Sequence, residues 1–476
     1  MGKLTAVLAR RPRWLAPLAV GVLAACWFVG ILFWMQAAHP ELLFEGFRFR
    51  DESSDSAWQT LRLWELWLIG PRALWLSHIY PPAYDAIRWV LMQPEVSKGE
   101  SPSILAVDER LYLLSAVLFA IVASVIYLWI RDLTHKGWWA FAGATLWCLL
   151  PASISFFTLM NQTGLAITSM AIAFYLLYRF CRTRRNVYAA GFLASIFVAS
   201  MTRNVSQVHV VIVLALAAIC FYFMGRPRRP WALVVNVILV ALICVWPARS
   251  YILYGTFDVS THTGYNRAGA LWINPASVPE PTWPDNIVRN GVDLSSGWNT
   301  QETLRDNYRL GLAANDFMLH HPVEAAGRLW ASLKITMPVM FRSVYVQWGN
   351  AFLLVFPLAQ PMDWIFSGFR FVALIAAAII IIGWKAGARG SLRLLRRYAW
   401  FGIVWVLVAI PVVFSNRYWP VDVPEPIHSE ADRLRALIDT PIYVLLVYAA
   451  FLVARGVWPR RVEPTPPSGA LTATRR

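Results

Sequence analysis

The sequence contains about ten apolar segments that we expect to cross a lipid bilayer as helices. A helix of about 20 apolar residues covers the hydrocarbon core and satisfies its backbone hydrogen bonds internally, as water-free lipid requires. The 476-residue chain is 58% hydrophobic and 15% charged, whereas soluble proteins are nearer half apolar and a quarter charged. The sequence therefore predicts an all-α polytopic membrane protein. The predicted spans are about 14–36, 111–130, 138–157, 164–180, 187–201, 207–224, 231–249, 365–384, 398–414 and 440–457.

Basic residues lie mainly in the short connectors between these segments. If the spans alternate in direction, all of these connectors fall on one side, as the positive-inside rule gives for cytoplasmic loops. The formal net charge of +16 is then a consequence of topology and does not indicate nucleic-acid binding. An even number of spans predicts a multi-pass protein of the inner (plasma) membrane with both termini in the cytoplasm. The basic connectors are at 3–13, 131–136, 179–185, 226–229, 385–397 and 455–461.

The spacing of the apolar segments divides the chain into four parts. Residues 1–250 form an N-terminal transmembrane module that includes a first large outer loop at 37–110. Residues 251–364 form a second large outer loop, and residues 365–457 carry the C-terminal transmembrane helices. A cytoplasmic tail at 458–476 is rich in Pro, Thr and Ala and is expected to be disordered.

Both outer loops contain periodic apolar stretches that are not long enough to cross the bilayer. The stretches 58–68 and 84–92 suit amphipathic helices in the membrane interface, with tryptophans at headgroup level. The second loop is predicted to be helical over 303–337, with a break at His321-Pro322. Connectors of this size between closely spaced helices are usually functional, so we expect the chemistry of the protein there.

An acidic stretch, RDESSDSAW at 50–58, opens the first outer loop. Asp51, Glu52 and Asp55 are candidate catalytic residues, because a carboxylate can take the proton from an acceptor hydroxyl. The same oxygens could hold a divalent cation such as Mg²⁺ or Mn²⁺, although no residues have convincing metal-site spacing. Taken alone, such a stretch is more often a solvated loop.

Several arginines lie near the outer ends of the predicted spans, where the positive-inside rule does not place them. Snorkelling of the side chain to the interface explains any single one of them. As a group on the same side as the acidic stretch, they suit an anionic headgroup, because a guanidinium binds phosphate through two hydrogen bonds. Sugar transfer from a lipid phosphate needs such a base and such cations. These arginines are Arg203, Arg249, Arg342, Arg433 and Arg435.

Motifs for soluble nucleotides and common hydrolases are absent from the chain. It contains no Walker A sequence, no glycine-rich dinucleotide turn, no HExxH and no GxSxG. A donor that arrives within the bilayer would need no nucleotide-binding domain.

Seven motifs, in order along nearly the whole chain, resemble the GT-C superfamily of polyprenyl-phosphate-sugar glycosyltransferases, most closely its protein-mannosyltransferase-like branch (family 39). After RDESSDSAW come a Pro-Pro step in HIYPPAYDAIRWVLM, an arginine in DERLYLLSAVL and a Thr-Arg step in ASMTRNVS. WPARSYILYGTFDVSTHTGYNRAG is similar to the family pattern W-x-x-R-N-Y-x-x-F-G followed by S-T and G-x-N. NDFMLHHPVEAAGRLWASLKI and EADRLRALIDTPIYVLLVYAAFL resemble its His-Pro amphipathic helix and the start of its last span.

This resemblance implies a GT-C-like fold with its site at the outer face. It implies catalytic roles for Asp51 as the favoured base, for Glu52 as its support and for Asp55, since DESSDSAW aligns on either acid. The family usually has an acid before the fourth span, where this chain has Asn161 and Gln162. The residues implied in substrate binding are Tyr80, Pro81, Pro82, Asn161, Arg203, Arg249, Asn266, Arg433 and Arg435.

The resemblance and the residues together predict a membrane glycosyltransferase. It would pass a sugar from a polyprenyl-phosphate donor to a glycan, lipid or protein acceptor on the outer (periplasmic or extracytoplasmic) face. The alternative class is a lipid or polysaccharide transporter, although the two halves show no internal repeat. A non-catalytic accessory subunit of the same fold is the other alternative, and the departure at Asn161 and Gln162 would favour it if it disables the site.

Overall fold

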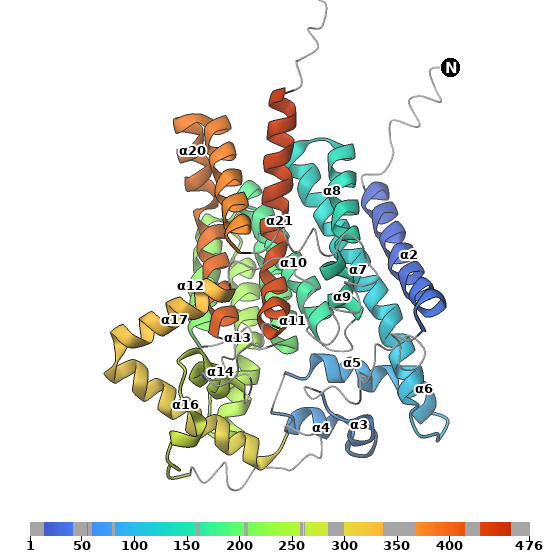
Figure 1. Ribbon diagram of the computed structural model, residues 1–476, viewed down its shortest axis with the longest axis vertical. Helices are drawn as coiled ribbons and strands as arrows, with labels where there is room; N and C mark the ends of the chain where they lie inside the picture. The colour runs from blue at the N-terminus through green and yellow to red at the C-terminus, as the bar shows by residue number, and fades with distance from the viewer. Residues whose placement is uncertain are drawn as a thin grey trace, which may run out of the picture.

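A computed structural model of the chain describes residues 14–40, 55, 60–78, 81–158, 162–203, 208–257, 260, 262–283, 299–336, 365, 368–414 and 429–457. Over these residues the chain is almost entirely helical and has no β-strand. Figure 1 shows a bundle of long helices with shorter helices gathered at one end. The predicted all-α class is confirmed.

Six helices of the described chain are long and apolar enough to cross a membrane. A seventh candidate is a pair of helices, α8 and α9, which meet at an angle of 60°. The protein is therefore a multi-pass membrane protein. The six helices are α2 (Leu15–Ala38), α7 (Ile104–Thr134), α10 (Thr163–Thr183), α13 (Pro230–Tyr254), α20 (Gly368–Phe414) and α21 (Ser429–Val457).

The remaining apolar helices are shorter. They are α8 (Gly137–Leu149), α9 (Pro151–Thr158), α11 (Asn186–Thr202) and α12 (Val208–Met224). Each of the ten or so predicted segments overlaps one of these helices or one of the long ones. With α20 counted as one helix, length and composition support six candidate spans, or seven with the bent pair, which is fewer than the ten predicted.

Helix α20 consists of two arms that meet at Gly387, whose φ of 66° is outside the helical range. In a continuous helix, residues eight positions apart are separated by about 12 Å along the axis. The Ser391 hydroxyl nevertheless donates a hydrogen bond of 3.0 Å to the carbonyl oxygen of Gly383. The chain therefore turns back at Gly387, and the predicted segments 365–384 and 398–414 belong to different arms.

The two ends of the bundle differ (Figure 1). Helix α2 begins and α21 ends at the same end, which we call the termini end. The opposite end, which we call the loop end, carries the short helices of the two long segments between spans, 37–110 and 251–364. Those of the first segment are α3 (Leu63–Ile69), α4 (Pro71–Leu76), α5 (Ala83–Leu91) and α6 (Gln93–Val96). Those of the second are α14 (His262–Ala270), the 3-10 turn η2 (Pro275–Ser277), α16 (Gln301–His320) and α17 (Pro322–Thr336).

The short helices follow the periodic stretches of the sequence. Helix α5 coincides with the predicted stretch 84–92, and α3 begins within the stretch 58–68. The backbone leaves the helical conformation at His321, where φ is −127°, and α17 starts at Pro322. Proline lacks an N–H donor and suits the first turn of a helix, so the break lies where the His-Pro step predicts it.

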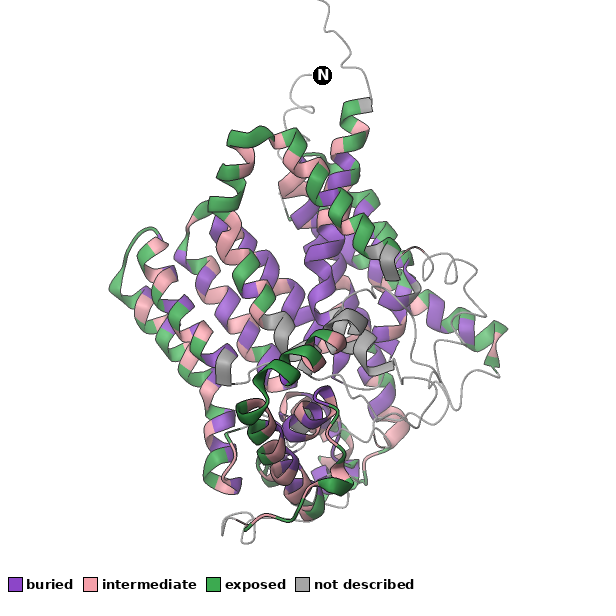
Figure 2. Cartoon of the chain, turned by 60° about the vertical axis from the view of Figure 1, so that its left-hand side comes forward, coloured by how far each residue is buried: buried purple, intermediate pink, exposed green. Residues whose placement is uncertain are grey.

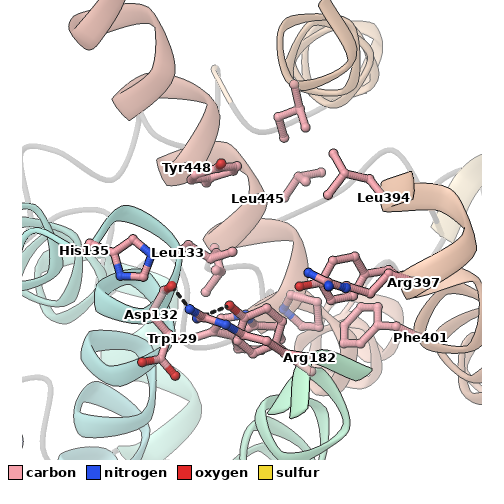
Figure 3. A pocket seen from close by; sticks show the side chains of 15 residues that line it. Trp129, Asp132, Leu133, His135, Arg182, Leu394, Arg397, Phe401, Leu445 and Tyr448 are labelled. Carbon is pink, nitrogen blue, oxygen red and sulfur yellow. Dashed lines mark hydrogen bonds between the residues drawn. The ribbon is translucent and has the colours of Figure 1, made fainter. Parts of the chain in front are cut away.

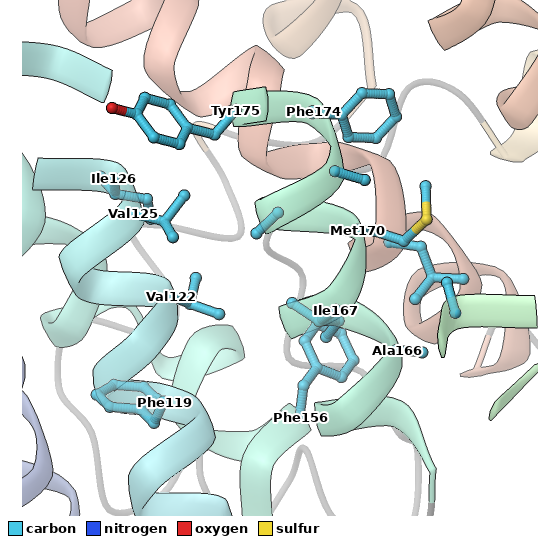
Figure 4. Packing of buried hydrophobic residues seen from close by; sticks show 14 of the residues in the cluster. Phe119, Val122, Val125, Ile126, Phe156, Ala166, Ile167, Met170, Phe174 and Tyr175 are labelled. Carbon is cyan, nitrogen blue, oxygen red and sulfur yellow. The ribbon is translucent and has the colours of Figure 1, made fainter. Parts of the chain in front are cut away.

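Helix α10 lies at the centre of the bundle and α20 at its edge. Of the most apolar stretch of each helix, 78% is buried in α10 and 6% in α20. Ile167 and Met170 of α10 and Phe119 and Ile126 of α7 belong to one buried cluster (Figure 4). Figure 2 shows the buried residues concentrated in the middle of the bundle. The centre is thus a close-packed core on which the outer helices are arranged.

The outer helices expose apolar side chains. On α13, Val234, Val237, Ile238 and Val245 are each about half exposed, and α2, α12 and α20 have similar surfaces. Soluble monomers rarely expose contiguous apolar patches above a few hundred Å². Lipid chains would cover this surface, which agrees with the multi-pass assignment.

The packing of α14 on α16 depends on a glycine. The Gly264 N–H donates a 2.6 Å hydrogen bond to Asn307 Oδ1, and a Cβ at position 264 would lie 2.0 Å from the Asn307 carbonyl oxygen. Gly264→Ala is expected to lower the free energy of unfolding by about 1–3 kcal/mol, because the two helix backbones must separate. Thermal unfolding of the purified protein in detergent measures this effect.

Gly311 of α16 provides the matched control in the same contact. A Cβ there would meet only the Gly264 Cα, at 3.6 Å, which is ordinary van der Waals distance. Gly311→Ala should leave the melting temperature unchanged or raise it, since alanine favours a helix. Equal melting temperatures for the two variants would show that the close approach of α14 to α16 is not required.

Candidate functional site

A buried arginine, Arg88 of α5, holds the first inter-span segment together at the loop end. Its guanidinium donates hydrogen bonds to the carbonyl oxygen of Leu61 and, at 2.7 Å, to Asp85 Oδ1. Asp55 Oδ1 lies 3.9 Å from Arg88 Nη2 and accepts a hydrogen bond from the Leu63 N–H. The Arg88 side chain is fully buried, whereas that of Asp55 is 20% exposed. One of the three candidate acids is therefore fixed by both α3 and α5.

Asp85 is the buried acid of this cluster. Its Oδ2 accepts a 3.2 Å hydrogen bond from the Leu61 N–H. Burial raises the pKa of the Asp85 carboxyl and outweighs the opposing attraction of Arg88. Because the folded protein then holds this proton more tightly than the unfolded chain, the stability contributed by Asp85 falls as the pH rises above the ordinary carboxyl pKa.

Arg110, the arginine of the DERLYLLSAVL motif, anchors α6 to the start of α7. It forms a two-bond ion pair with Glu95, in which Nη1 and Oε2 are 2.8 Å apart, and it donates to the Leu91 carbonyl oxygen. The hydrogen bonds from Arg110 lower the pKa of the Glu95 carboxyl. This contact ties the end of the first segment to the core helix α7.

Arg249, near the C-terminal end of α13, is enclosed by aromatic rings. Its guanidinium carbon lies 4.6 Å from the ring centroid of Trp246, 4.9 Å from that of Tyr254 and 5.7 Å from that of Trp75. Its Nη2 donates to the Trp75 carbonyl oxygen and, at 3.3 Å, to the Tyr254 hydroxyl.

The rest of the Arg249 guanidinium lacks partners within the described chain. The residue is 2% exposed, and neither Nε nor Nη1 has a hydrogen-bond acceptor among the described residues. A buried guanidinium without a counter-ion is costly, although the surrounding rings offset part of the cost through cation–π attraction. The arrangement is suited to an anion that accepts from Nε and Nη1.

The two long segments meet beside Arg249. The Tyr254 hydroxyl donates a 2.8 Å hydrogen bond to the Leu76 carbonyl oxygen. The His78 N–H donates at 3.0 Å to Asn299 Oδ1, just before α16. The rings of His78 and Tyr254 lie edge to face, 5.6 Å apart. We call the residues at this junction the loop-end site: Trp75, Leu76, His78, Arg249, Tyr254 and Asn299.

The structure describes six of the residues that the sequence assigns to the site. Pro82 precedes α5 at its N-terminus, and the neighbouring Pro81 is buried. Arg203 is buried where α11 ends, and Asn266 is buried on α14. Asp55 and Arg249 have the contacts given above. Four predicted site residues lie outside the described part of the chain: Asp51, Glu52, Tyr80 and Asn161. Two more, Arg433 and Arg435, lie on α21, but the structure does not describe their side chains.

Asp55, the described residue of the acidic stretch, and Arg249 both lie at the loop end but have different immediate neighbours. The arginine beside Asp55 is Arg88, which belongs to the same inter-span segment. Arg249 contacts α4 through Trp75 and has no described carboxylate as a partner. Helix α4 contacts α3 and α5 as well as Arg249, so it links the Asp55 cluster to Arg249.

Several residues were not identified from the sequence as site candidates. Asp85 and Arg88 are three positions apart on a helix, a spacing that allows an ion pair. That spacing could have identified the pair from the sequence. Asp439 is buried within the candidate span of α21, and a carboxylate at membrane depth is itself an indication of function. No comparable local signal marks Trp75.

The divalent-cation hypothesis has no support within the described residues. No group of three or more His, Cys, Asp or Glu side chains there could hold a metal ion. The candidate ligands Asp51 and Glu52 lie outside that part of the chain.

Comparison with known proteins gives no match: no family model, no curated protein and no solved structure is similar to this chain.

Proposed function

We propose that this protein is a membrane glycosyltransferase of the GT-C type, which transfers a sugar from a polyprenyl-phosphate donor to a glycan, lipid or protein acceptor. About ten segments would then cross the plasma membrane, with the loop end on the outer face and the termini in the cytoplasm. The seven motifs in the sequence support this function. The gathering of both long segments at one end of the bundle also supports it (Figure 1).

The observation that carries the proposal is Arg249. A guanidinium buried against three aromatic rings, with two nitrogens lacking acceptors in the described chain, is suited to a phosphate oxygen. Charge-assisted hydrogen bonds of this kind are stronger than neutral ones, and they gain strength where water is excluded. The phosphate of a lipid-linked sugar would supply the missing acceptor at the end of α13.

The reaction then needs a base and a stabilised leaving group. Asp51 takes the proton from the acceptor hydroxyl, and Glu52 supports it. The acceptor oxygen forms a bond to the anomeric carbon while the bond from that carbon to the phosphate oxygen breaks, and its electrons leave with the phosphate. Arg249 and Arg203 stabilise that charge. A single displacement of this kind inverts the anomeric configuration.

Asp55 has a positioning role in this scheme. Its carboxylate already accepts from the Leu63 N–H and lies beside Arg88. It therefore anchors the acidic stretch to α3 and α5, while Asp51 acts on the acceptor.

Incubation of the purified full-length protein with radiolabelled polyprenyl-phosphate sugars tests the proposal. The expected result is time-dependent release of polyprenyl phosphate, with the label recovered in an acceptor fraction. In liposomes, a transporter would move the intact labelled lipid between leaflets without cleaving it. An accessory subunit would bind the donor and leave it intact, and either of these results would overturn the enzymatic assignment.

A further inference from the structure

A cavity of about 520 Å³ lies at the termini end, between α7, α10, α20 and α21 (Figure 3). This volume falls in the range of small-molecule binding sites. Most of its wall is apolar or aromatic. The residues that make up this part of the wall are Trp129, Leu133, Tyr178, Ile382, Leu394, Tyr398, Phe401, Pro441, Val444, Leu445 and Tyr448.

Arg182 of α10 is one of two arginines in the wall. Its Nη1 donates to the Asp132 carbonyl oxygen at 2.6 Å and to the Tyr178 hydroxyl at 3.2 Å. These two bonds fix the orientation of the guanidinium. Neither Nε nor Nη2 donates a hydrogen bond to another described residue, so both remain available to a ligand.

Arg397, on the second arm of α20, is the second arginine in the cavity wall. It has no hydrogen bond or ion pair with any described residue, and its side chain is exposed. The adjacent Tyr398 ring stacks on the Tyr178 ring, with centroids 5.9 Å apart and planes inclined by 4°, which holds this arm against α10. Figure 3 shows Arg182 and Arg397 on the same side of the cavity, across from Tyr448.

The charge of the wall is positive. Asp132 is the single acid among the described lining residues, and its Oδ2 is paired with Arg179 at 2.7 Å, outside the cavity. Neither Arg182 nor Arg397 forms an ion pair with a described acid, so the two arginines give the cavity wall a net positive charge. An anion is the complementary ligand.

We propose that this cavity binds an anionic amphiphile, with a phosphate group held by Arg182 and Arg397 and a hydrocarbon chain against the apolar wall. Inorganic phosphate would leave the apolar wall uncovered, and a neutral lipid would leave two guanidinium groups without acceptors. The connectors 131–136, 179–185 and 385–397 make this end strongly basic, and basic pockets between membrane helices suit lipid headgroups. The cavity is at the opposite end from Arg249, so this inference does not depend on glycosyl transfer.

Equilibrium binding to the purified full-length protein in detergent tests the ligand class with three probes. Dioleoyl phosphatidic acid is expected to bind saturably, with a Kd at least about tenfold below those of dioleoylglycerol and inorganic phosphate. Equal binding of dioleoylglycerol would show that the phosphate is not recognised. Equal binding of inorganic phosphate would show that the site takes a free anion, and either result overturns the proposal.

Substitutions test the location. Arg182→Gln and Arg397→Gln should each weaken phosphatidic acid binding about tenfold or more. Arg393→Gln is the matched control: Arg393 is exposed on the same arm, donates to the Arg389 carbonyl oxygen at 3.4 Å and does not line the cavity. An equal loss for Arg393→Gln would mean that general surface charge attracts the lipid.

A further substitution fills part of the cavity with a larger side chain and leaves its charge unchanged. Leu445→Trp places a larger apolar side chain on the wall formed by α21 and is expected to reduce phosphatidic acid binding, with the melting temperature showing that the fold is retained. Wild-type binding by a folded Leu445→Trp variant would place the lipid elsewhere on the protein.

Discussion

Arg88→Ala is expected to lower the free energy of unfolding by about 3–5 kcal/mol, the usual effect of removing one partner of a buried ion pair. The substitution leaves Asp85 buried without its cation and removes the donor to the Leu61 carbonyl oxygen. It also removes the guanidinium beside Asp55. Chemical and thermal unfolding of the purified protein in detergent would measure the loss.

Two controls separate the ion pair from other effects of the substitution. Arg72→Ala removes an exposed arginine of α4 in the same segment and should change stability by less than about 0.5 kcal/mol. Combining Arg88→Met with Asp85→Leu removes both charges and should cost less than Arg88→Ala alone, because no unpaired charge stays buried. If the double variant is the less stable one, the pair itself stabilises the segment more than its desolvation costs.

Apolar segment length predicted the helices well because lipid allows few alternatives. Backbone groups in the bilayer core must be satisfied internally, so each long apolar run becomes a helix, as α2, α7 and α13 do. The number of spans was harder to predict. Helices α11 and α12 have 17 residues each, or about 25 Å at 1.5 Å per residue, which is shorter than the hydrocarbon core of about 30 Å.

Breaks within apolar segments were also difficult to place. The segment 138–157 reads as one span, but α8 ends at Leu149 and α9 begins at Pro151, with a bend of 60° between them. Proline cannot donate the helical hydrogen bond, so it ends or bends a helix, but the size of the bend depends on packing. Hydropathy averaged over the segment contains no such information.

At the loop end, the sequence identified a residue but not its surroundings. Arg249 attracted notice because a cation at the outer end of a predicted span is unusual. Its aromatic enclosure includes Trp75, which is 174 positions away in the chain. Likewise, Asp55 was selected as an acid, while its contact with Arg88 arises from the packing of α3 on α5. Local patterns do not encode such distant contacts.

Asp51→Asn is expected to reduce sugar transfer by about 10²–10⁴-fold, the usual contribution of a general base. Asparagine keeps the size of the side chain and its capacity to form hydrogen bonds, but it cannot take the acceptor proton. Donor binding and the melting temperature should stay near their wild-type values, since the fold of the first segment depends on Asp85 and Arg88. Transfer rates measured with saturating polyprenyl-phosphate sugar would give the effect.

Asp55→Asn is the matched comparison, because it changes a neighbouring acid with known contacts. Asparagine can still accept from the Leu63 N–H but loses the attraction to Arg88 at 3.9 Å. The melting temperature of the Asp55→Asn variant should therefore fall, while much of its transfer activity remains. Full activity of Asp51→Asn would exclude Asp51 as the base. If Asp55→Asn abolishes transfer at an unchanged melting temperature, Asp55 is the base, because a positioning residue could not lose its ion pair without some loss of stability.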